Sequence, residues 1–291
     1  MLCTQCPRKC GAERLPAVPA GVCAMPETAV VARAALHLWE EPPISGKRGA
    51  GTVFFSGCNL RCVFCQNSSI SQDGFGKPVS VERLREIFSE LIAQGTHNID
   101  LVTPTHFAHV LREALAEPLG VPVVWNTGGY ESVETLQSLE GKVQVYLPDL
   151  KYLDSERARR YSAAPDYPQV ATAAIKEMFR QTGPCVFDEE GVLQRGVLIR
   201  HLLLPGGVNE AKAVMDWVAA EFPRGSVWFS LMSQYVPLGR AGEYPEIDRR
   251  LRKSEIRSAQ EYMAALELPG YTQDVEAASG DYVPSFDLTG V

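Results

Sequence analysis

Six short runs of apolar and β-branched residues, separated by segments with helical periodicity, constrain the fold of this chain more than any other feature. Continuous apolar strands are typical of a sheet that is buried on both faces. Strands that alternate with helices are joined by right-handed crossovers, so neighbouring strands run parallel. The pattern therefore predicts an α/β fold, either a parallel sheet or a barrel. The runs are Gly51–Ser56, Ile99–Thr103, Val121–Asn126, Val143–Leu147, Val197–Leu204 and Ser226–Leu231.

Helical patterns lie between and after these runs. Ser80 is a typical N-cap for a helix that extends to about Gly95, with its apolar side chains on one face. Residues 185–195 are typical of a small hairpin insertion. We therefore divide the chain into a Cys-rich appendage (residues 1–30), a barrel (31–245) and a C-terminal helix with an irregular extension (246–291). The other predicted helices begin at Thr105 or His106 and end near Glu117, or cover Glu131–Leu139, Asp166–Arg180, Asn209–Phe222 and Ser254–Leu266.

Charge and cysteine usage narrow the class of protein. The chain has 28 basic and 35 acidic residues, a net charge of −7, which argues against broad binding to nucleic acid or to an anionic membrane. We find neither a secretory signal pattern nor an apolar run that could span a bilayer. Seven of the eight cysteines fall in two tight clusters, which is typical of metal ligands in a reducing compartment. We therefore expect a cytoplasmic protein with no nucleic-acid or membrane partner.

One of these clusters, Cys58, Cys62 and Cys65, forms a C-x3-C-x2-C motif directly after the first apolar run. Loops at the carboxyl ends of parallel strands are where ligands bind in such folds. Thiolates favour iron–sulfur clusters and zinc. A structural zinc site needs a fourth ligand, and no His or Cys follows within a dozen residues. We therefore interpret the motif as the holder of a [4Fe–4S] cluster with one open iron; a zinc knuckle or unligated thiols are the alternatives.

This motif, with the aromatic Phe64 before its last cysteine, is the signature of the radical S-adenosylmethionine (SAM) superfamily, which the chain resembles over nearly its whole length. The segments 40–46 and 51–58 resemble a branch related to pyruvate formate-lyase activating enzymes. Strand-end segments 103–106, 147–151 and 231–235, and Arg200 with Pro205 and Gly206, also resemble that branch. The resemblance implies a partial (β/α)6 TIM-like barrel of parallel strands.

The resemblance also implies an activity. SAM would chelate the open iron through its amino and carboxylate groups. An electron from a low-potential donor of the flavodoxin or ferredoxin type would then cleave SAM to methionine and a 5′-deoxyadenosyl radical, which abstracts a hydrogen atom. The implied substrate is a protein or peptide. A radical SAM catalyst for a small molecule is the second hypothesis, and a non-catalytic iron–sulfur redox sensor or zinc-binding interaction module is the third.

Residues at the other strand ends are the predicted cofactor contacts. Asn126 and Thr127 end the third run, and Asp149 and Lys151 follow the fourth. By resemblance, Lys151 neutralises the SAM carboxylate, and Asp149 with Asn126, Thr127 and Met232 can form a monovalent-cation site beside it. A surface salt bridge is the alternative for Asp149 and Lys151. The full set of predicted cofactor-binding residues is Phe64, Thr103, Thr105, Asn126, Thr127, Asp149, Lys151 and Gln234.

Arg200 lies inside an otherwise apolar strand. A buried guanidinium is costly without a partner, so we expect an anionic ligand or a carboxylate to face it. We place Arg200 with the cluster cysteines among the catalytic residues; a structural ion pair is the alternative.

The sequence departs from the superfamily at the second strand end. Most members have a Gly-Gly-Glu-like turn that receives the amino group of SAM, and Thr103-Pro104-Thr105-His106 occupies that position here. Hydroxyl and carbonyl oxygens can still accept hydrogen bonds from an amine. The carboxylate of that turn is absent from this segment.

The second cluster, Cys3, Cys6, Cys10 and Cys23, offers four soft ligands in a segment that lacks a core of its own. A metal would supply the folding energy that so short a segment lacks. Four thiolates suit either a second [4Fe–4S] cluster or zinc. Unligated thiols are the third interpretation.

Overall fold

A single sheet forms the centre of the protein. The computed structural model describes residues 2–273 and 284–291, in which ten strands join in one sheet. All six predicted strands are present, and each pairs in parallel with the next in the predicted series. They are β2 (Ala50–Phe55), β4 (Ile99–Val102), β5 (Val123–Thr127), β6 (Val145–Pro148), β8 (Leu193–Leu202) and β9 (Trp228–Met232).

The sheet is open rather than closed, which confirms the predicted partial barrel. Its order is β10-β9-β8-β6-β5-β4-β2-β1-β3, with the hairpin strand β7 (Val186–Phe187) paired to β8. The pattern of the sequence missed both edges. β1 (Ala29–His37) and β3 (Lys77–Val79) add antiparallel strands beside β2, and β10 (Gly270–Thr272) adds a parallel strand beside β9. β1 is rich in alanine, so pairing with β2 and β3, not strand propensity, explains its extended form.

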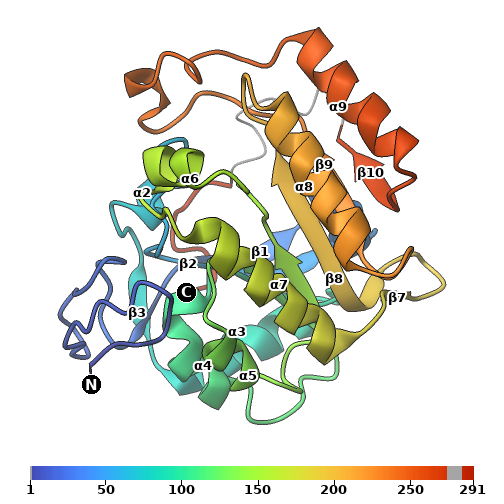
Figure 1. Ribbon diagram of the computed structural model, residues 1–291. Helices are drawn as coiled ribbons and strands as arrows, with labels where there is room; N and C mark the ends of the chain where they lie inside the picture. Colours follow the sequence, from blue (N-terminus) through green and yellow to red (C-terminus); the bar gives the residue numbers. More distant parts are fainter. Residues whose placement is uncertain (1, 274–283) are drawn as a thin grey trace.

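Helices follow the strands as predicted (Figure 1). α6 was not predicted because only Ala158 and Tyr161 among its residues are apolar. The Asp154 carboxylate caps it by accepting hydrogen bonds from the backbone amides of Glu156 and Arg157. The helices are α1 (Pro42–Ser45), α2 (Ser68–Ser71), α3 (Val81–Ala93), α4 (Ala108–Ala114), α5 (Val133–Gln137), α6 (Ser155–Ser162), α7 (Tyr167–Thr182), α8 (Val208–Glu221) and α9 (Lys253–Ala265), with 3₁₀ turns η1 (Thr105–Phe107) and η2 (Ala241–Glu243).

The helices bury one face against the sheet. The side chains of Leu84, Ile87, Phe88 and Leu91 on α3 are buried, and α3 contacts β1, β2 and β4. α7 contacts β6 and β8 in the same way, while α8 packs against α9. Each fully buried side chain of this size contributes about 1.5–3 kcal/mol relative to exposure, so this packing carries the stability of the fold. Every helix in the described ranges is too short or too polar to cross a lipid bilayer.

Both ends of the chain lie against the sheet. Arg14 of the Cys-rich appendage is buried and donates hydrogen bonds to the carbonyls of Pro26 and His106, which fastens the appendage to the end of β4. At the other end, the Leu288 amide donates to the Ala32 carbonyl of β1, and the Ala34 amide donates to Thr289. Residues 274–283 of the predicted C-terminal extension lie outside the described residues.

The cap of α3 provides a direct test of this local analysis. The Ser80 side chain accepts a hydrogen bond from the Arg83 amide, as the sequence predicted. We expect Ser80→Ala to lower the free energy of unfolding by about 1 kcal/mol, because this amide loses its partner. Ser89→Ala on the exposed face of the same helix is the control and should change it by less than about 0.5 kcal/mol. Equal effects of the two variants in urea unfolding would contradict the assignment.

Candidate active site

A cavity of about 890 Å³ opens at the carboxyl ends of the parallel strands. This is the edge at which parallel α/β folds bind ligands. Every site residue predicted outside the N-terminal appendage lines this one cavity, although the sequence segments that carry them are far apart. They are Cys58, Cys62, Phe64, Cys65, Thr103, Thr105, Asn126, Thr127, Asp149, Lys151, Arg200 and Gln234.

The cysteine loop leaves β2 through Gly57, whose φ is +80°. A Cβ at Gly57 would lie 2.2 Å from Cγ of Met25, so only glycine fits between β2 and the appendage. Within the loop, Sγ of Cys62 lies 3.0 Å from Oγ of Ser162, and Sγ of Cys65 lies 3.2 Å from Oγ of Ser71. Hydroxyls at these distances can donate hydrogen bonds to thiolates. The loop thus holds its thiols in a polar, largely enclosed setting.

Burial dominates the electrostatics of these thiols. It raises the pKa of Cys62 to about 12 and also raises the pKa of Cys65, although the charge of Lys151 lowers both. Without a metal the two thiols are therefore neutral at physiological pH. Metal ligation requires thiolates, so loading this loop with metal must release protons.

The lining of the cavity fits a bound cofactor. Oδ1 of Asn67 and Oε1 of Gln234 are buried there without a hydrogen-bond partner, and buried acceptors are normally satisfied. Donor groups of a ligand can fill both. Across residues 2–273 and 284–291, no group of three or more His, Cys, Asp and Glu side chains is arranged to hold a metal ion.

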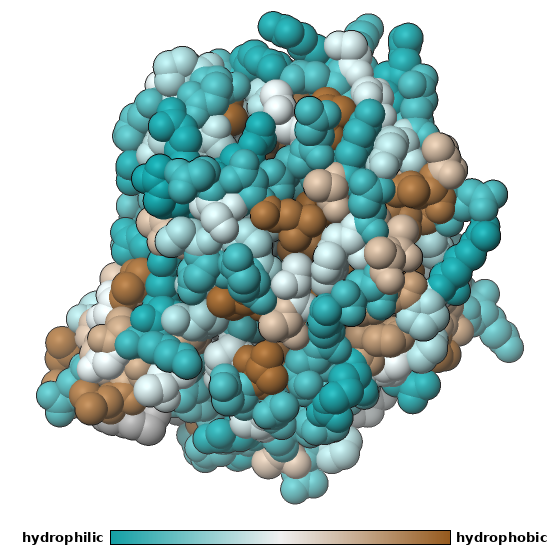
Figure 2. All heavy atoms as spheres, in the orientation of Figure 1, coloured by the Kyte–Doolittle hydropathy of each residue, from teal (hydrophilic) through white to brown (hydrophobic). Residues whose placement is uncertain are grey.

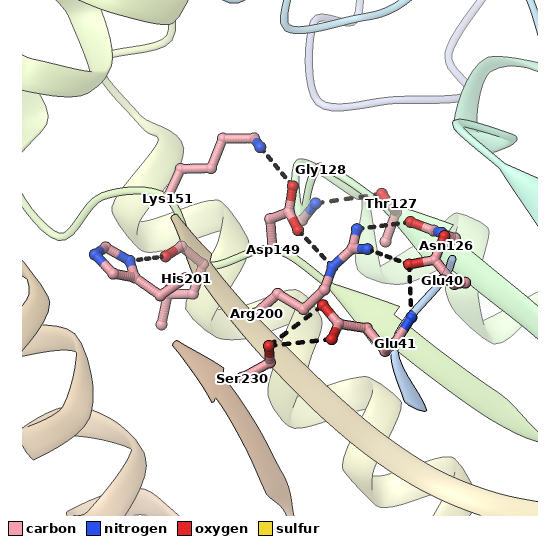
Figure 3. Close-up of polar contacts among 12 residues, drawn as sticks. Glu40, Glu41, Asn126, Thr127, Gly128, Asp149, Lys151, Arg200, His201 and Ser230 are labelled. Carbon is pink, nitrogen blue, oxygen red and sulfur yellow. Dashed lines mark hydrogen bonds and ion pairs between the residues drawn. The ribbon is translucent and has the colours of Figure 1, made fainter. Parts of the chain in front are cut away.

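Arg200 is the centre of the polar network beside the cysteines (Figure 3). Its Nε donates to Oδ1 of Asp149 at 2.9 Å, and its Nη1 donates to Oε1 of Glu40 at 2.9 Å. Nη2 donates to Oδ1 of Asn126 at 2.7 Å. The expected carboxylate partner of Arg200 is therefore present, and there are two, Asp149 and Glu40. These contacts join β8 to the ends of β5 and β6 and to the segment between β1 and α1.

The charges of this network support one another. Burial opposes the charge of Arg200, but Asp149 and Glu40 more than offset it and raise the pKa of the guanidinium. Burial likewise opposes ionisation of Asp149, yet Arg200 and Lys151 hold the pKa of this carboxyl below its usual value. Nζ of Lys151 lies 2.5 Å from Oδ2 of Asp149. Both Asp149 oxygens therefore pair with cations of the chain itself. Binding of the SAM carboxylate by Lys151, and of a monovalent cation by Asp149, stay predictions.

Two acidic residues of the cavity, Glu40 and Glu41, carried no predicted role. The Glu41 side chain is buried and accepts hydrogen bonds from Ser230, Tyr271 and Gln273. Burial raises the pKa of Glu41, and the neighbouring charge of Glu40 adds to the effect. The sequence shows Glu40 and Glu41 as an acidic pair just before two prolines. Their position near Arg200 depends on the path of β1, which precedes them.

Residues 103–106 carry no carboxylate, but one from another strand end lies beside them. Glu131, from the loop between β5 and α5, reaches the turn after β4. Its Oε1 accepts hydrogen bonds from the hydroxyls of Thr105 and Thr127 and from the Trp125 indole. From its residue pattern, Glu131 was expected to begin a helix. Its contact with Thr105 depends on the pairing of β4 with β5, which spacing along the chain does not reveal.

The backbone around this carboxylate is unusually constrained. Thr103 has a φ of +58°, a left-handed conformation that non-glycine residues rarely adopt. Gly129, just before Glu131, has a φ of +80°, and a Cβ there would lie 2.2 Å from the carbonyl oxygen of Asp149. Such strain persists only where the surrounding structure enforces it, and it is frequent at functional sites.

The N-terminal cysteines lie outside the cavity. Cys3, Cys6 and Cys23 are buried and Cys10 is exposed. Their appendage is tied to the cysteine loop by Arg8, whose guanidinium donates to the carbonyls of Asn59 and Ser162. Burial raises the pKa of Cys6 to about 12, with added repulsion from Cys23 and Cys3. The charges of Cys3, Cys6 and Cys23 thus act on one another within a segment that Arg8 fastens beside the active-site loop.

Comparisons with known proteins place this fold and site in a family. Residues 52–206 match the family model of the radical SAM superfamily, which is more than half of the chain. The chain therefore belongs to the radical SAM superfamily. It is 32% identical over 237 residues to an uncharacterized protein of Methanocaldococcus jannaschii, a match that covers 78% of this chain and 64% of that relative. The chain thus spans slightly less than two thirds of the length of its curated relative.

One solved structure supports the fold, and a second shows a weaker similarity. Methylornithine synthase superposes with a TM-score of 0.50 at 16% identity, covering 73% of this chain and 62% of that one. SuiB of Streptococcus suis, solved bound to S-adenosylmethionine, gives a TM-score of 0.47 at 15% identity, covering 80% of this chain and 48% of that one. At this level of identity the likeness concerns the fold alone.

The Arg200 network predicts a large loss of stability on truncation. We expect Arg200→Met to lower the free energy of unfolding by roughly 3 kcal/mol, because the mostly buried Glu40 loses its cation and Asp149 keeps only Lys151. Arg160→Met, which removes an exposed partner of Glu246, is the control and should change little. Urea unfolding of both variants checks this, and a mild effect of Arg200→Met would show that the network is solvated.

The burial of Glu131 leads us to expect a pH-dependent difference in stability between the wild type and Glu131→Gln. Burial raises its pKa from 4.5 to about 7, against the hydrogen bonds from Thr105, Thr127 and Trp125. A raised pKa stabilises the fold below pH 4.5, and this contribution is lost as pH rises through 7. Glu131→Gln should therefore gain stability relative to the wild type between pH 5 and pH 8, by about 2–3 kcal/mol. Urea unfolding of the metal-free proteins at both pH values tests this; a difference independent of pH would contradict it.

Proposed function

We propose that this protein is a radical SAM enzyme that cleaves SAM reductively and abstracts a hydrogen atom from a protein or peptide. The observation that carries the proposal is the single cavity that joins the three motif cysteines to the polar ends of β4, β5, β6 and β8. A cluster loop alone would also suit a redox sensor. A sensor has no need of the buried polar groups that face the same cavity.

The chain divides the work of binding among these residues. When bound and reduced, a [4Fe–4S] cluster supplies the electron that converts SAM to methionine and a 5′-deoxyadenosyl radical. Cys58, Cys62 and Cys65 would hold that cluster, with Ser162 and Ser71 as hydrogen-bond donors to the thiolates. The other polar residues of the cavity would bind and orient SAM.

Two residues at the rim of the cluster loop complete this proposed binding site. The ring of Phe64 packs edge-on against Tyr161 and Tyr235, which fixes the segment before Cys65. Gln234 follows β9 and presents the unpartnered Oε1 described above. We assign both residues to cofactor binding.

The open sheet supports a large substrate. A closed barrel admits a ligand only through its ends, whereas an open sheet leaves a lateral gap between its edges. Glycyl-radical-activase-like chemistry on a protein or peptide suits such a gap. A small-molecule substrate is the alternative, and a product assay that compares extracts with and without macromolecules separates the two.

The appendage is proposed to be a second metal site that takes part in electron delivery. Arg8 of the appendage donates hydrogen bonds to the carbonyls of Asn59 in the cluster loop and of Ser162. The appendage also exposes apolar side chains, where hydrophobic atoms gather at the lower left of Figure 2: Leu2, Leu15, Val18 and Val22. A flavodoxin- or ferredoxin-type donor would dock near this surface. Anaerobic reconstitution distinguishes the metals: about eight irons per chain indicate a second cubane, and about four irons with one zinc indicate a structural metal.

Removal of one cluster ligand tests the proposed activity. Wild-type protein, reconstituted with iron and sulfide, reduced and supplied with SAM, should form 5′-deoxyadenosine. Cys62→Ala should lose this activity and about four irons, because three thiolates are needed to hold the cubane. Cys185→Ala, at a half-buried thiol outside the cavity, is the matched control and should retain both. Full activity of Cys62→Ala would refute the cluster assignment, and a loaded wild type without SAM cleavage in the presence of cell extract would favour the sensor.

A further inference from the structure

Glu131 is a buried carboxylate without a compensating cation. Its side chain is 1% exposed, and its Oε2 has no hydrogen-bond partner. The groups that act on its charge are the hydroxyls of Thr105 and Thr127 and the Trp125 indole, all neutral. Burial of an unpaired carboxylate is costly. By contrast, the Asp149 carboxylate, also at this mouth, is paired with both Arg200 and Lys151. The site around Glu131 is therefore electrostatically incomplete.

The two threonine hydroxyls connect Glu131 to the cavity. Thr105 and Thr127 line the cavity, whereas Glu131 lies behind them. A hydroxyl has one hydrogen, and both threonines direct theirs to Oε1 of Glu131. The Gly129 amide takes one acceptor position of Thr127. The remaining lone pairs can only accept hydrogen bonds, so this wall of the cavity suits a group that donates and carries positive charge.

We propose that Glu131 is a positioning residue that makes Thr105 and Thr127 a paired acceptor for the amino group of an amino-acid ligand, which on the proposed function is the α-amino group of SAM. An amino group that is protonated or bound to a metal has N–H donors and no free lone pair, so it matches this wall. The positive charge of a protonated amino group, or the polarised N–H groups of a metal-bound one, also offsets the buried carboxylate behind the hydroxyls. On this proposal, the loop after β5 supplies the acidic residue that the turn after β4 lacks.

A purely structural role for Glu131 explains less. The N-cap of α5 is Ser132, whose side chain accepts from the Thr135 amide, so the helix does not depend on Glu131. A glutamine at position 131 would accept the same hydroxyl hydrogens without the cost of a buried charge. An uncompensated carboxylate at this position is therefore explained better by a cationic partner than by packing alone.

A double-substitution cycle on protein and ligand tests the proposal through binding, not turnover. The dissociation constants of SAM and of its desamino analogue, with hydrogen in place of the α-amino group, are measured anaerobically by equilibrium dialysis. Loaded wild type and Glu131→Gln are compared. We expect the substitution to weaken SAM about tenfold and the analogue less than about twofold, because the carboxylate acts through the amino group. Glu177→Gln, a buried carboxylate of α7 paired with Arg180, is the matched control and should alter neither constant.

Each outcome has a distinct meaning. Equal weakening of SAM and the analogue would assign Glu131 a structural role and overturn the inference, as would unchanged binding of both. A wild type that binds no SAM would instead contradict the proposed function. If Glu131→Gln does not fold, Thr105→Val and Thr105→Ser give the same test. The inference requires selective loss of SAM affinity in the valine variant and its recovery in the serine variant, which restores the hydroxyl.

Discussion

The geometry of the cavity depends on the ion pairs of Arg200, whose guanidinium is mostly buried. It lies within a strand and bonds to Asp149, Glu40 and Asn126, which come from three other segments. A charge in such a position is tolerated only when its hydrogen-bonding partners are complete. Its partners are thereby fixed in place, and with them the carboxyl ends of β5 and β6. Desolvation of the guanidinium costs free energy, and the same requirement for complete partners restricts the geometry of the site.

The two sides of the cavity differ in electrostatic balance, and the difference bears on the ligand. On one side Asp149 is held between two cations, Arg200 and Lys151. On the other side Glu131 has only neutral donors. Thr105, in front of Glu131, lines the same cavity as Lys151 and the cysteine loop. The charges near Lys151 are therefore balanced within the chain, whereas that of Glu131 is not.

The periphery of the sheet adapts the fold to this site. The appendage is fastened to the cysteine loop by Arg8 and to the turn after β4 by Arg14, so it braces the two places where the backbone must hold unusual conformations. Tyr271 of β10 donates a hydrogen bond to Glu41 beneath the Arg200 network. Segments from both ends of the chain therefore complete a site whose motif lies near residue 60.

The sequence by itself determined the six parallel strands, the cap of α3, the cysteine motif and the superfamily, because each follows from local periodicity or from close spacing of a few residue types. It also picked out Thr103, Asp149 and Lys151, which line the cavity just after strands β4 and β6. Only the tertiary structure decided the two edges of the sheet, the double carboxylate of Arg200 and the place of Glu131. β1 lacks strand propensity, and Glu40 and Glu131 meet their partners across 160 and 26 residues of chain. Such contacts depend on which strands pair, and that is settled by packing of the whole sheet.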